Sequence, residues 1–427
     1  MTLEEALSFI HQTDWKGNRP GLERMEAMMR HLGDPHKKLK FVHVAGTNGK
    51  GSTCAMLASI LTAAGYRTGL YTSPHLDKIS ERIAIDGTDI CDADFVSAAE
   101  QVRAAAEGIS EAPSEFEIIT AMALYYFARK QCDIVVLEVG LGGRLDATNV
   151  IPAPEAAVIT NIGLDHTEIL GNTLVQIARE KAGIIKTGCD CICYHGKPEV
   201  VAVFQKACAE RQVPFHCADF LQVQDAVQGI DGQSFTWNGT RYFIPLLGNH
   251  QLRNASVVLE TADILRQRGW RIGTDAIVTG LQHVRWPARM EVLGKNPLFI
   301  LDGGHNPQCA QALAESLKAL LPGKKIVFLM GVLADKNYQQ IIDPLLPFAQ
   351  EFVCLTPASE RALPAEALRD SLISLNAKAS AWADPQKAIC HAFSSAGKMG
   401  TIVAIGSLYM TSQIRRAYDL VKDTQGQ

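Results

Sequence analysis

The chain has 427 residues, of which 47% are hydrophobic and 20% are charged, and its formal net charge is −4. This length predicts two or three domains, and the composition is typical of a globular enzyme with an ample core. The slight acidity argues against a nucleic-acid-binding protein, which usually carries a basic surface. No apolar run approaches the roughly 20 residues that cross a membrane, so we expect no membrane partner.

Eleven cysteines are scattered along the chain. An odd number of cysteines without a leader sequence indicates a reducing, cytoplasmic location. The segment from Thr2 to Glu5 has the pattern of a capping box that begins a helix. Cys189, Cys191 and Cys193 alternate and would share one face of a strand. A metal site is one interpretation of these three, but small apolar residues in a buried strand are favoured.

The first half of the chain alternates apolar strands with helices. Strands that are apolar almost throughout are typical of a parallel sheet covered on both faces. We expect strands at residues 41–45, 68–71, 134–139, 156–160 and 191–194. We expect helices at residues 52–64, 93–107, 117–130 and 173–184.

Residues 216–246 have a different pattern, with short alternating segments around Gly232 and Asn238-Gly239. These turn signals predict a small antiparallel insert. Helices are expected at 249–268 and 274–282, and further strands at 298–301, 325–330, 352–355, 378–382 and 401–405. We therefore predict an α/β protein with two domains: a P-loop-containing, mostly parallel sheet domain with the insert at residues 1–296, and a smaller Rossmann-like α/β domain at 297–427.

A glycine-rich turn, Gly46-Thr-Asn-Gly-Lys-Gly-Ser52, joins the first strand to the helix that follows. Glycines let backbone N–H groups approach an anion, the helix N-terminus adds donors, and Lys50 adds a cation. The turn departs from the standard P-loop because residue 44 is valine and the hydroxyls follow Gly51. We interpret it as a variant cradle for a nucleoside triphosphate, with an ordinary strand–helix turn as the alternative.

Three strand ends offer ligands for the divalent cation that phosphoryl chemistry needs. Ser73 follows the second strand, Glu138 closes the third, and His166 follows the fourth. A carboxylate that ends a buried strand is costly unless it is paired or bound to metal, so Glu138 is the most informative of the three. Each residue also has an interpretation without metal: Glu138 could be a glutamate at the rim of the sheet, Ser73 could shape the turn before Pro74, and His166 could be a surface histidine.

Two lysines lie in the segment from Glu180 to Lys186. Lys181 is three to four residues from Ile177 and Ile184, so its stem is expected to be partly buried. A buried lysine has a lowered pKa and can be modified or act in catalysis. Lys186 is expected to be solvated.

In the second domain, Asp302 and His305 sit on a glycine turn at the end of a predicted strand. Asn306 and Pro307 fit the N-cap and the first position of a helix. An acid at such a turn commonly binds ribose hydroxyls, and an Asp turn with a solvated histidine is the alternative. Arg289, between the domains in sequence, could bind phosphates.

Together these motifs resemble those of the folylpolyglutamate synthase and dihydrofolate synthase family, within the Mur ligase superfamily. The matching segments are 43–52, 71–76, 81–83, 137–149, 164–166, 180–186, 286–289 and 302–307, in family order. One departure is Gly304, where the family often has alanine. The resemblance implies that ATP phosphorylates a carboxylate of a pteroate or folate, and that the amino group of L-glutamate then displaces phosphate to form an amide.

Matched residue by residue, the resemblance implies nucleotide, metal and substrate sites. The implied nucleotide contacts are Gly49, Lys50, Gly51, Ser52, Asn254, Arg289, Asp302 and His305. The implied Mg²⁺ ligands are Ser73, Glu138, His166 and a carbamylated Lys181, and a monovalent cation such as K⁺ is a further candidate. The implied substrate contacts are Arg82, Phe116, Glu117, Leu145, Asp146, Ala147 and Ser407, and the implied catalytic residues are Lys50, Lys181 and His305.

Three hypotheses about function follow. The first is a monomeric bifunctional ligase of dihydropteroate and folates, which Phe116-Glu117 and Leu145-Asp146 favour over folylpolyglutamate synthase alone. Phe116 could instead be a core residue at a helix start. The second is another Mur-type ligase, against which the roughly 40 residues before the P-loop argue, because a separate UDP-binding domain needs more. The third, a nucleotide-gated binding module, would need less metal apparatus than Ser73, Glu138 and His166 provide.

Overall fold

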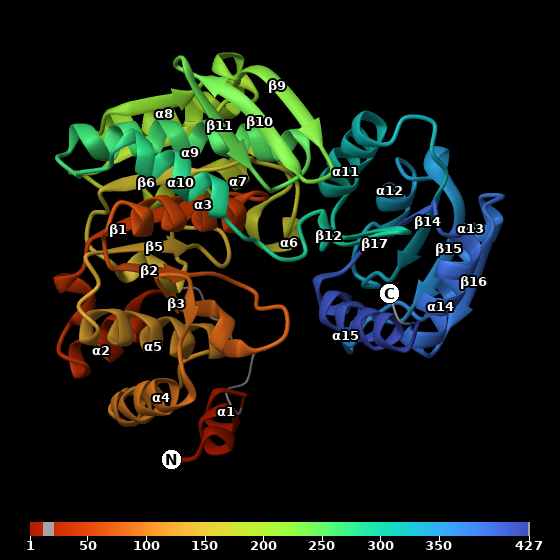
Figure 1. Ribbon diagram of the computed structural model, residues 1–427. Coiled ribbons are helices and arrows are strands. Elements are labelled where there is room, and N and C mark those ends of the chain that lie inside the picture. The colour runs from red at the N-terminus through yellow and green to blue at the C-terminus, as the bar shows by residue number, and fades with distance from the viewer. Residues whose placement is uncertain (12–20, 426–427) are drawn as a thin grey trace. The chain divides into compact units, whose positions relative to one another are not determined.

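The computed structural model describes residues 1–11 and 21–425 (Figure 1). The chain divides into two compact units. The first comprises Met1–Gln224, Thr236–Tyr242 and Leu252–Val284, and the second comprises Asp225–Phe235, Phe243–Gln251 and Arg285–Gln427. The predicted α/β fold class is confirmed, because each unit is built on its own largely parallel sheet.

The first unit contains an eight-stranded sheet with strand order β4-β3-β2-β5-β1-β6-β7-β8. Its strands are β1 Phe41–Ala45, β2 Thr68–Tyr71, β3 Ile83–Ile85, β4 Thr88–Asp89, β5 Ile134–Glu138, β6 Ala156–Ile159, β7 Asp190–Tyr194 and β8 Phe215–Ala218. Strands β2, β5, β1, β6, β7 and β8 are parallel, whereas β3 and β4 pair antiparallel. The sequence did not predict β3, β4 or β8, because the first two are very short and the third is a half-exposed edge strand.

Helices cover this sheet. They are α1 Leu3–His11, α2 Glu23–His31, α3 Lys50–Ala63, α4 Asp92–Glu107, α5 Glu115–Arg129, α6 Thr167–Leu170, α7 Leu174–Lys181, α8 Pro198–Arg211, α9 Asn249–Gln267 and α10 Thr274–His283. The expected capping box is present, since Thr2 and Glu5 exchange hydrogen bonds at 2.7 and 3.1 Å. In Figure 1, α3 lies beside α10, and Ser59 Oγ donates to the Gly280 carbonyl at 2.7 Å. Helix α3 is therefore apolar nearly all round, because it packs on the sheet and on α10.

The second unit contains a six-stranded sheet with strand order β12-β13-β17-β14-β15-β16. Its strands are β12 Glu291–Lys295, β13 Leu298–Leu301, β14 Ile326–Met330, β15 Ala349–Leu355, β16 Ala379–Trp382 and β17 Thr401–Ile405. Its helices are α11 Pro307–Leu320, α12 Tyr338–Ile342, α13 Ala365–Ser374, α14 Pro385–Ala396 and α15 Leu408–Gln425. Only β12 runs antiparallel within this sheet, and it begins at Glu291, ahead of the predicted boundary at residue 297.

The predicted insert is a three-stranded sheet of order β11-β10-β9. Its strands are β9 Gln224–Gly229, β10 Gly232–Trp237 and β11 Thr240–Ile244. Asn238 and Gly239 join β10 to β11 with φ values of 46° and 75°. Two successive left-handed residues are what a two-residue hairpin turn of type I′ requires, and Asn-Gly adopts that conformation at little cost.

The alternating cysteines lie in an apolar core. Cys191 and Cys193 on β7 are fully buried, and Cys189 is 1% exposed. They pack in one cluster with Ile184 and Phe204. Among the described residues, no helix is both long and apolar enough to span a membrane.

A buried ionic network ties α9 to the amino-terminal ends of β6 and β7. Arg268 donates to Glu155 at 3.0 Å and to Asp190 at 2.7 Å, and Lys40 lies 3.1 Å from the other oxygen of Glu155. Each of the two acids is only 9% exposed. Two carboxylates this deeply buried need their cations, because an unpaired buried charge is strongly destabilising.

Arg268→Ala is expected to lower the free energy of unfolding by about 2 kcal/mol, a value reduced from that of a fully buried pair because the arginine is partly exposed. Urea unfolding followed by circular dichroism measures this. The matched control is Lys206→Ala, which removes an exposed pair with Glu210 on α8 and should change stability by less than about 0.5 kcal/mol. An equal loss of unfolding free energy in the two variants would contradict a stabilising role for the Arg268 network.

Candidate active site

The glycine-rich turn between β1 and α3 is clamped to the segment that follows β6. Thr47 N–H donates to the Asn161 carbonyl at 2.8 Å, and Thr47 Oγ1 lies 3.1 Å from both the N–H and the carbonyl oxygen of Gly163. Thr160 Oγ1 donates to the Asn48 carbonyl at 2.9 Å. Sequence reasoning did not find this clamp. The local signal was limited to two polar residues, Thr160 and Asn161, directly after β6.

Gly49 marks the point where the turn becomes helix. Its φ is 87°, and α3 begins at the next residue, Lys50. A Cβ on Gly49 would lie 2.6 Å from Asn254 Oδ1, so the side chain of Asn254 packs directly on this glycine. The structure thus brings Asn254 of α9, a predicted nucleotide contact, against the predicted phosphate cradle. Ser52, in the first turn of α3, is 3% exposed.

The carboxyl ends of β5, β1 and β2 bring Glu138, Lys50 and Ser73 together. Glu138 is 3% exposed, and it accepts a hydrogen bond from Ser73 N–H at 3.0 Å. Lys50 Nζ lies 3.9 Å from Glu138 Oε1 and donates to the Thr47 carbonyl at 3.3 Å. A buried carboxylate beside a serine and a phosphate-binding turn is a chemically suitable place for Mg²⁺, which prefers oxygen ligands and substrate phosphates.

His166 is the N-cap residue directly before α6, on the segment after β6. Its φ is 50°, its side chain is 46% exposed, and its Nε2 lies 4.0 Å from Asp165 Oδ1. Its role as a metal ligand stays a prediction.

Lys181, the last residue of α7, is 3% exposed and donates from Nζ to the Gly46 carbonyl at 2.9 Å. Burial and the nearby Lys50 ammonium lower the pKa of Lys181 to about 7. The expectation that Lys186 is solvated was wrong. Its Nζ donates to the carbonyls of Asn149 and Ile151, and burial lowers its pKa to about 8. The spacing of apolar residues predicted that Lys181 is buried. It could not predict the burial of Lys186, because the carbonyls that Lys186 binds belong to a distant segment of the chain.

The loop after β5 joins the metal side to the predicted substrate side. A Cβ on Gly143 would lie 3.0 Å from Lys181 Cα, and one on Gly140 would lie 2.5 Å from the ring of Phe116. The Phe116 ring also lies 6.1 Å from the ring of Tyr71, measured between centroids. The loop is thus packed between Lys181 and Phe116, which explains the need for glycines at both contacts.

The other predicted substrate residues are placed as follows. Glu117 is 4% exposed, lies 3.1 Å from Arg24 and closes a capping box with Ser114 at the start of α5. Arg82 donates from Nε to His75 Nδ1 at 2.9 Å. Three more are consecutive at the end of the loop: Leu145 is half-buried, whereas Asp146 and Ala147 are each 6% exposed.

In the second unit, the predicted residues gather at the carboxyl ends of β13 and β17. Asp302 accepts N–H donors from Met290 at 2.9 Å and Gly304 at 2.7 Å. A Cβ on Gly303 would lie 2.7 Å from Arg289 Nη1, so this arginine lies across the glycine turn.

His305 and Ser407 complete this group. His305 Nδ1 lies 3.1 Å from the Gly303 carbonyl, and Ser407 is 1% exposed next to Gly406, whose N–H donates to Gly304. Asn306 caps α11 through Cys309 N–H at 2.9 Å, as predicted.

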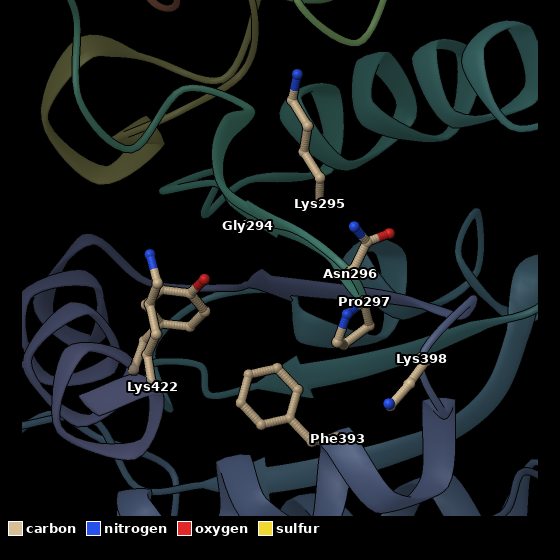
Figure 2. Close-up of a pocket in the computed structure, with 8 residues that line it drawn as sticks. Gly294, Lys295, Asn296, Pro297, Phe393, Lys398 and Lys422 are labelled. Atoms are coloured by element: carbon tan, nitrogen blue, oxygen red, sulfur yellow. The ribbon is translucent and has the colours of Figure 1, made fainter. Parts of the chain in front are cut away.

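A hollow of about 380 Å³ lies at the other end of the strands of this sheet, beside the turn from Gly294 to Pro297 that precedes β13 (Figure 2). Figure 2 shows the ring of Phe393, which belongs to α14, below Pro297 of this turn, and Lys398 and Lys422 also line the hollow. The hollow contains none of the predicted site residues, and it lies before β13 rather than after it.

Comparisons with known proteins identify the family. A model described as "Mur ligase middle domain" matches residues 44–262, and one described as "Mur ligase, glutamate ligase domain" matches residues 288–408. The Bacillus subtilis protein named dihydrofolate synthase/folylpolyglutamate synthase is 37% identical over 97% of this chain and 98% of its own length. The chain belongs to the folylpolyglutamate synthase/dihydrofolate synthase family of Mur ligases. It is therefore an ATP-dependent ligase.

Solved structures of similar proteins agree with this assignment. The Escherichia coli protein in complex with DHPP and ADP is 30% identical, with a TM-score of 0.86, over 98% of each chain. A complex described as FPGS–AMPPCP–folate is 34% identical, with a TM-score of 0.83, over 98% of this chain and 100% of that one. ADP and AMPPCP in these ligases support ATP as the nucleotide.

Gly49→Ala is expected to weaken nucleotide binding more than tenfold, because the added methyl would collide with Asn254 at the cradle. Isothermal titration with a non-hydrolysable ATP analogue measures this. Gly65→Ala is the matched control, since Gly65 has φ 88° but nothing within 4 Å of an added Cβ. Both variants should lose about 1 kcal/mol of stability from the left-handed conformation. A Gly49→Ala protein that binds nucleotide as well as Gly65→Ala would contradict the role of this contact.

Proposed function

We propose that this ligase adds L-glutamate to dihydropteroate and to the γ-carboxylate of folates, using ATP. The proposal rests on the loop after β5, which connects the predicted metal site to the predicted substrate site. This loop contacts Lys181 on one side and Phe116 on the other. The side with Lys181 is suited to bind a triphosphate and a metal ion, and the Phe116 side offers an aromatic ring that can stack on a flat heterocycle. The names of the relatives support folate as the substrate class.

In the proposed reaction, the substrate carboxylate oxygen attacks the γ-phosphorus and ADP leaves. The resulting acyl phosphate has a good leaving group, so the amine of L-glutamate attacks its carbonyl carbon and releases phosphate. Two anions must approach each other in the first step, and positive charge lowers that barrier. Lys50 and the N–H groups at the start of α3 are suited to hold the γ-phosphate, because the lysine is already held beside the turn by the Thr47 carbonyl.

We propose that Ser73 and Glu138 hold Mg²⁺, with His166 and a carbamylated Lys181 as further ligands. Bound there, the ion would neutralise phosphate charge. The residues fit such an ion, because the Glu138 carboxylate is buried at the carboxyl end of β5, beside Ser73 and the phosphate-binding turn. Arg289, Asp302 and His305 stay predicted nucleotide contacts, and the co-substrate L-glutamate and the monomeric state also remain predictions.

Glu138→Gln is expected to reduce ligation at least a hundredfold while the protein stays folded, since the amide keeps the shape but loses the charge. The assay supplies ATP, Mg²⁺, L-glutamate and 7,8-dihydropteroate and follows dihydrofolate by chromatography. Glu199→Gln, an exposed glutamate at the start of α8, is the control and should leave the rate unchanged. Full activity of Glu138→Gln would refute the metal assignment.

The same assay decides between the bifunctional ligase and folylpolyglutamate synthase alone. The relative named folylpolyglutamate synthase from Lacticaseibacillus casei is 36% identical over 97% of this chain, so the narrower function has support as well. Formation of dihydrofolate from dihydropteroate supports the bifunctional proposal. Glutamylation of tetrahydrofolate without any dihydrofolate formation would leave only the narrower function.

Lys181 is expected to carry a carbamate, because a pKa near 7 leaves its amine uncharged above that pH and able to attack CO₂. With ¹³C-labelled bicarbonate, a carbamate signal should be present in NMR spectra one pH unit above this pKa. Below the pKa the amine is protonated, so the signal should weaken. Lys181→Arg should abolish the signal and Lys186→Arg should retain it; a signal that disappears only in Lys186→Arg would contradict the assignment.

A further inference from the structure

A buried chain of three side chains runs beneath the loop that follows β5. His43 Nε2 on β1 lies 2.9 Å from Thr148 Oγ1, and this hydroxyl lies 2.5 Å from Asp146 Oδ1. Thr148 belongs to the short helix η4 Ala147–Val150, which Asp146 caps. The exposed fractions of His43, Thr148 and Asp146 are 0%, 0% and 6%. All three side chains are therefore buried, and they form hydrogen bonds with one another and with the backbone around them.

The positions of the protons follow from the number of donors. The Thr148 hydroxyl has one hydrogen, so it donates to only one of its two neighbours. Asp146 Oδ1 also accepts Thr148 N–H at 3.1 Å, and Oδ2 accepts Leu141 N–H at 2.8 Å. Burial raises the pKa of Asp146, but these donors lower it and favour the ionised carboxylate, which only accepts. The hydroxyl proton therefore goes to Asp146, and Thr148 must accept the hydrogen on His43 Nε2.

The other nitrogen of His43 agrees with this assignment. Nδ1 is buried and has no partner among the described residues. A bare acceptor nitrogen without a partner costs less than an unpaired buried N–H, so the hydrogen belongs on Nε2. Burial, aided by the charge of nearby Lys186, holds the pKa of His43 well below its usual value, so the ring is neutral.

Asp146 in turn holds the loop in place. Through Leu141 N–H it fixes the residue next to Gly140, which packs on the ring of Phe116. At the other end of the loop, Arg144 N–H donates to the Glu180 carbonyl at 2.8 Å. The carboxylate thus determines how closely the loop approaches Phe116.

We propose that His43 is a positioning residue for the pterin side of the reaction: its Nε2–H, relayed through Thr148, orients the Asp146 carboxylate that holds the loop against Phe116. This rests on the proposed function, in which Phe116 and Asp146 serve the pterin. A histidine that only fills space could be replaced by a leucine of similar size, whereas a relay needs a donor at the Nε2 position.

The test compares variants that keep or remove that donor. His43→Leu and Thr148→Val should each raise KM for 7,8-dihydropteroate about tenfold, the effect of one lost hydrogen bond, and leave KM for ATP within about twofold. The double variant should be no worse than either single one, because both break the same relay. His43→Gln, whose amide nitrogen reaches the Nε2 position, and Thr148→Ser should restore most of the affinity.

Val42→Ala is the control for stability alone. Val42 is fully buried on the same strand, so its truncation should destabilise the protein without changing KM for dihydropteroate. An equal rise in KM for Val42→Ala, or a His43→Gln protein no better than His43→Leu, would overturn the proposal.

A readout independent of turnover separates this proposal from the proposed function. The ¹⁵N shifts of the His43 ring in the full-length protein should report hydrogen on Nε2, and Leu141 N–H should exchange with solvent faster in His43→Leu than in His43→Gln. Hydrogen on Nδ1 would overturn the relay even in an active enzyme. Absence of dihydropteroate ligation by the unaltered protein, with the tautomer as expected, would refute the pterin role but leave the relay standing.

Discussion

The attachment of the glycine-rich turn to the end of β6 is the constraint on which the first unit depends. A Cβ on Gly46 would lie 1.8 Å from Thr160 Oγ1, so the two backbones approach as closely as a glycine allows. Thr47 then holds Asn161 and Gly163. Because α3 begins three residues after Thr47, this clamp determines where the helix N-terminus and its free N–H groups point.

Charges buried around this turn come from strands and helices far apart in sequence. Glu138 ends β5, Lys50 begins α3 and Lys181 ends α7. The lysine ammoniums are near enough for Lys50 to lower the pKa of Lys181, and the Glu138 carboxylate lies 3.9 Å from Lys50 Nζ. Such a cluster is unfavourable in an empty protein, and its cost is offset when anionic phosphates and a cation bind.

The same structural device recurs in the second unit. Asp302 and Asp146 both lie in glycine-containing loops that follow a strand, and both use their carboxylates to hold backbone N–H groups of nearby loops. An acid in this position stabilises a loop that has few apolar contacts of its own. Glycine beside such an acid has a steric advantage, because a Cβ on Gly304 would lie 2.7 Å from Asp302 Oδ1.

Local sequence patterns determined most of the strands, the helix caps and the fold class, because hydrophobic periodicity and turn chemistry act over a few residues. They also identified Glu138 and Lys181, because a charge inside an apolar run is informative by itself. They could not predict strand order, the clamp at Asn161 and Gly163, the burial of Lys186 or the chain from His43 to Asp146. Each of these joins segments tens of residues or more apart, and only the parallel pairing of β5, β1 and β6 brings those segments within hydrogen-bonding distance.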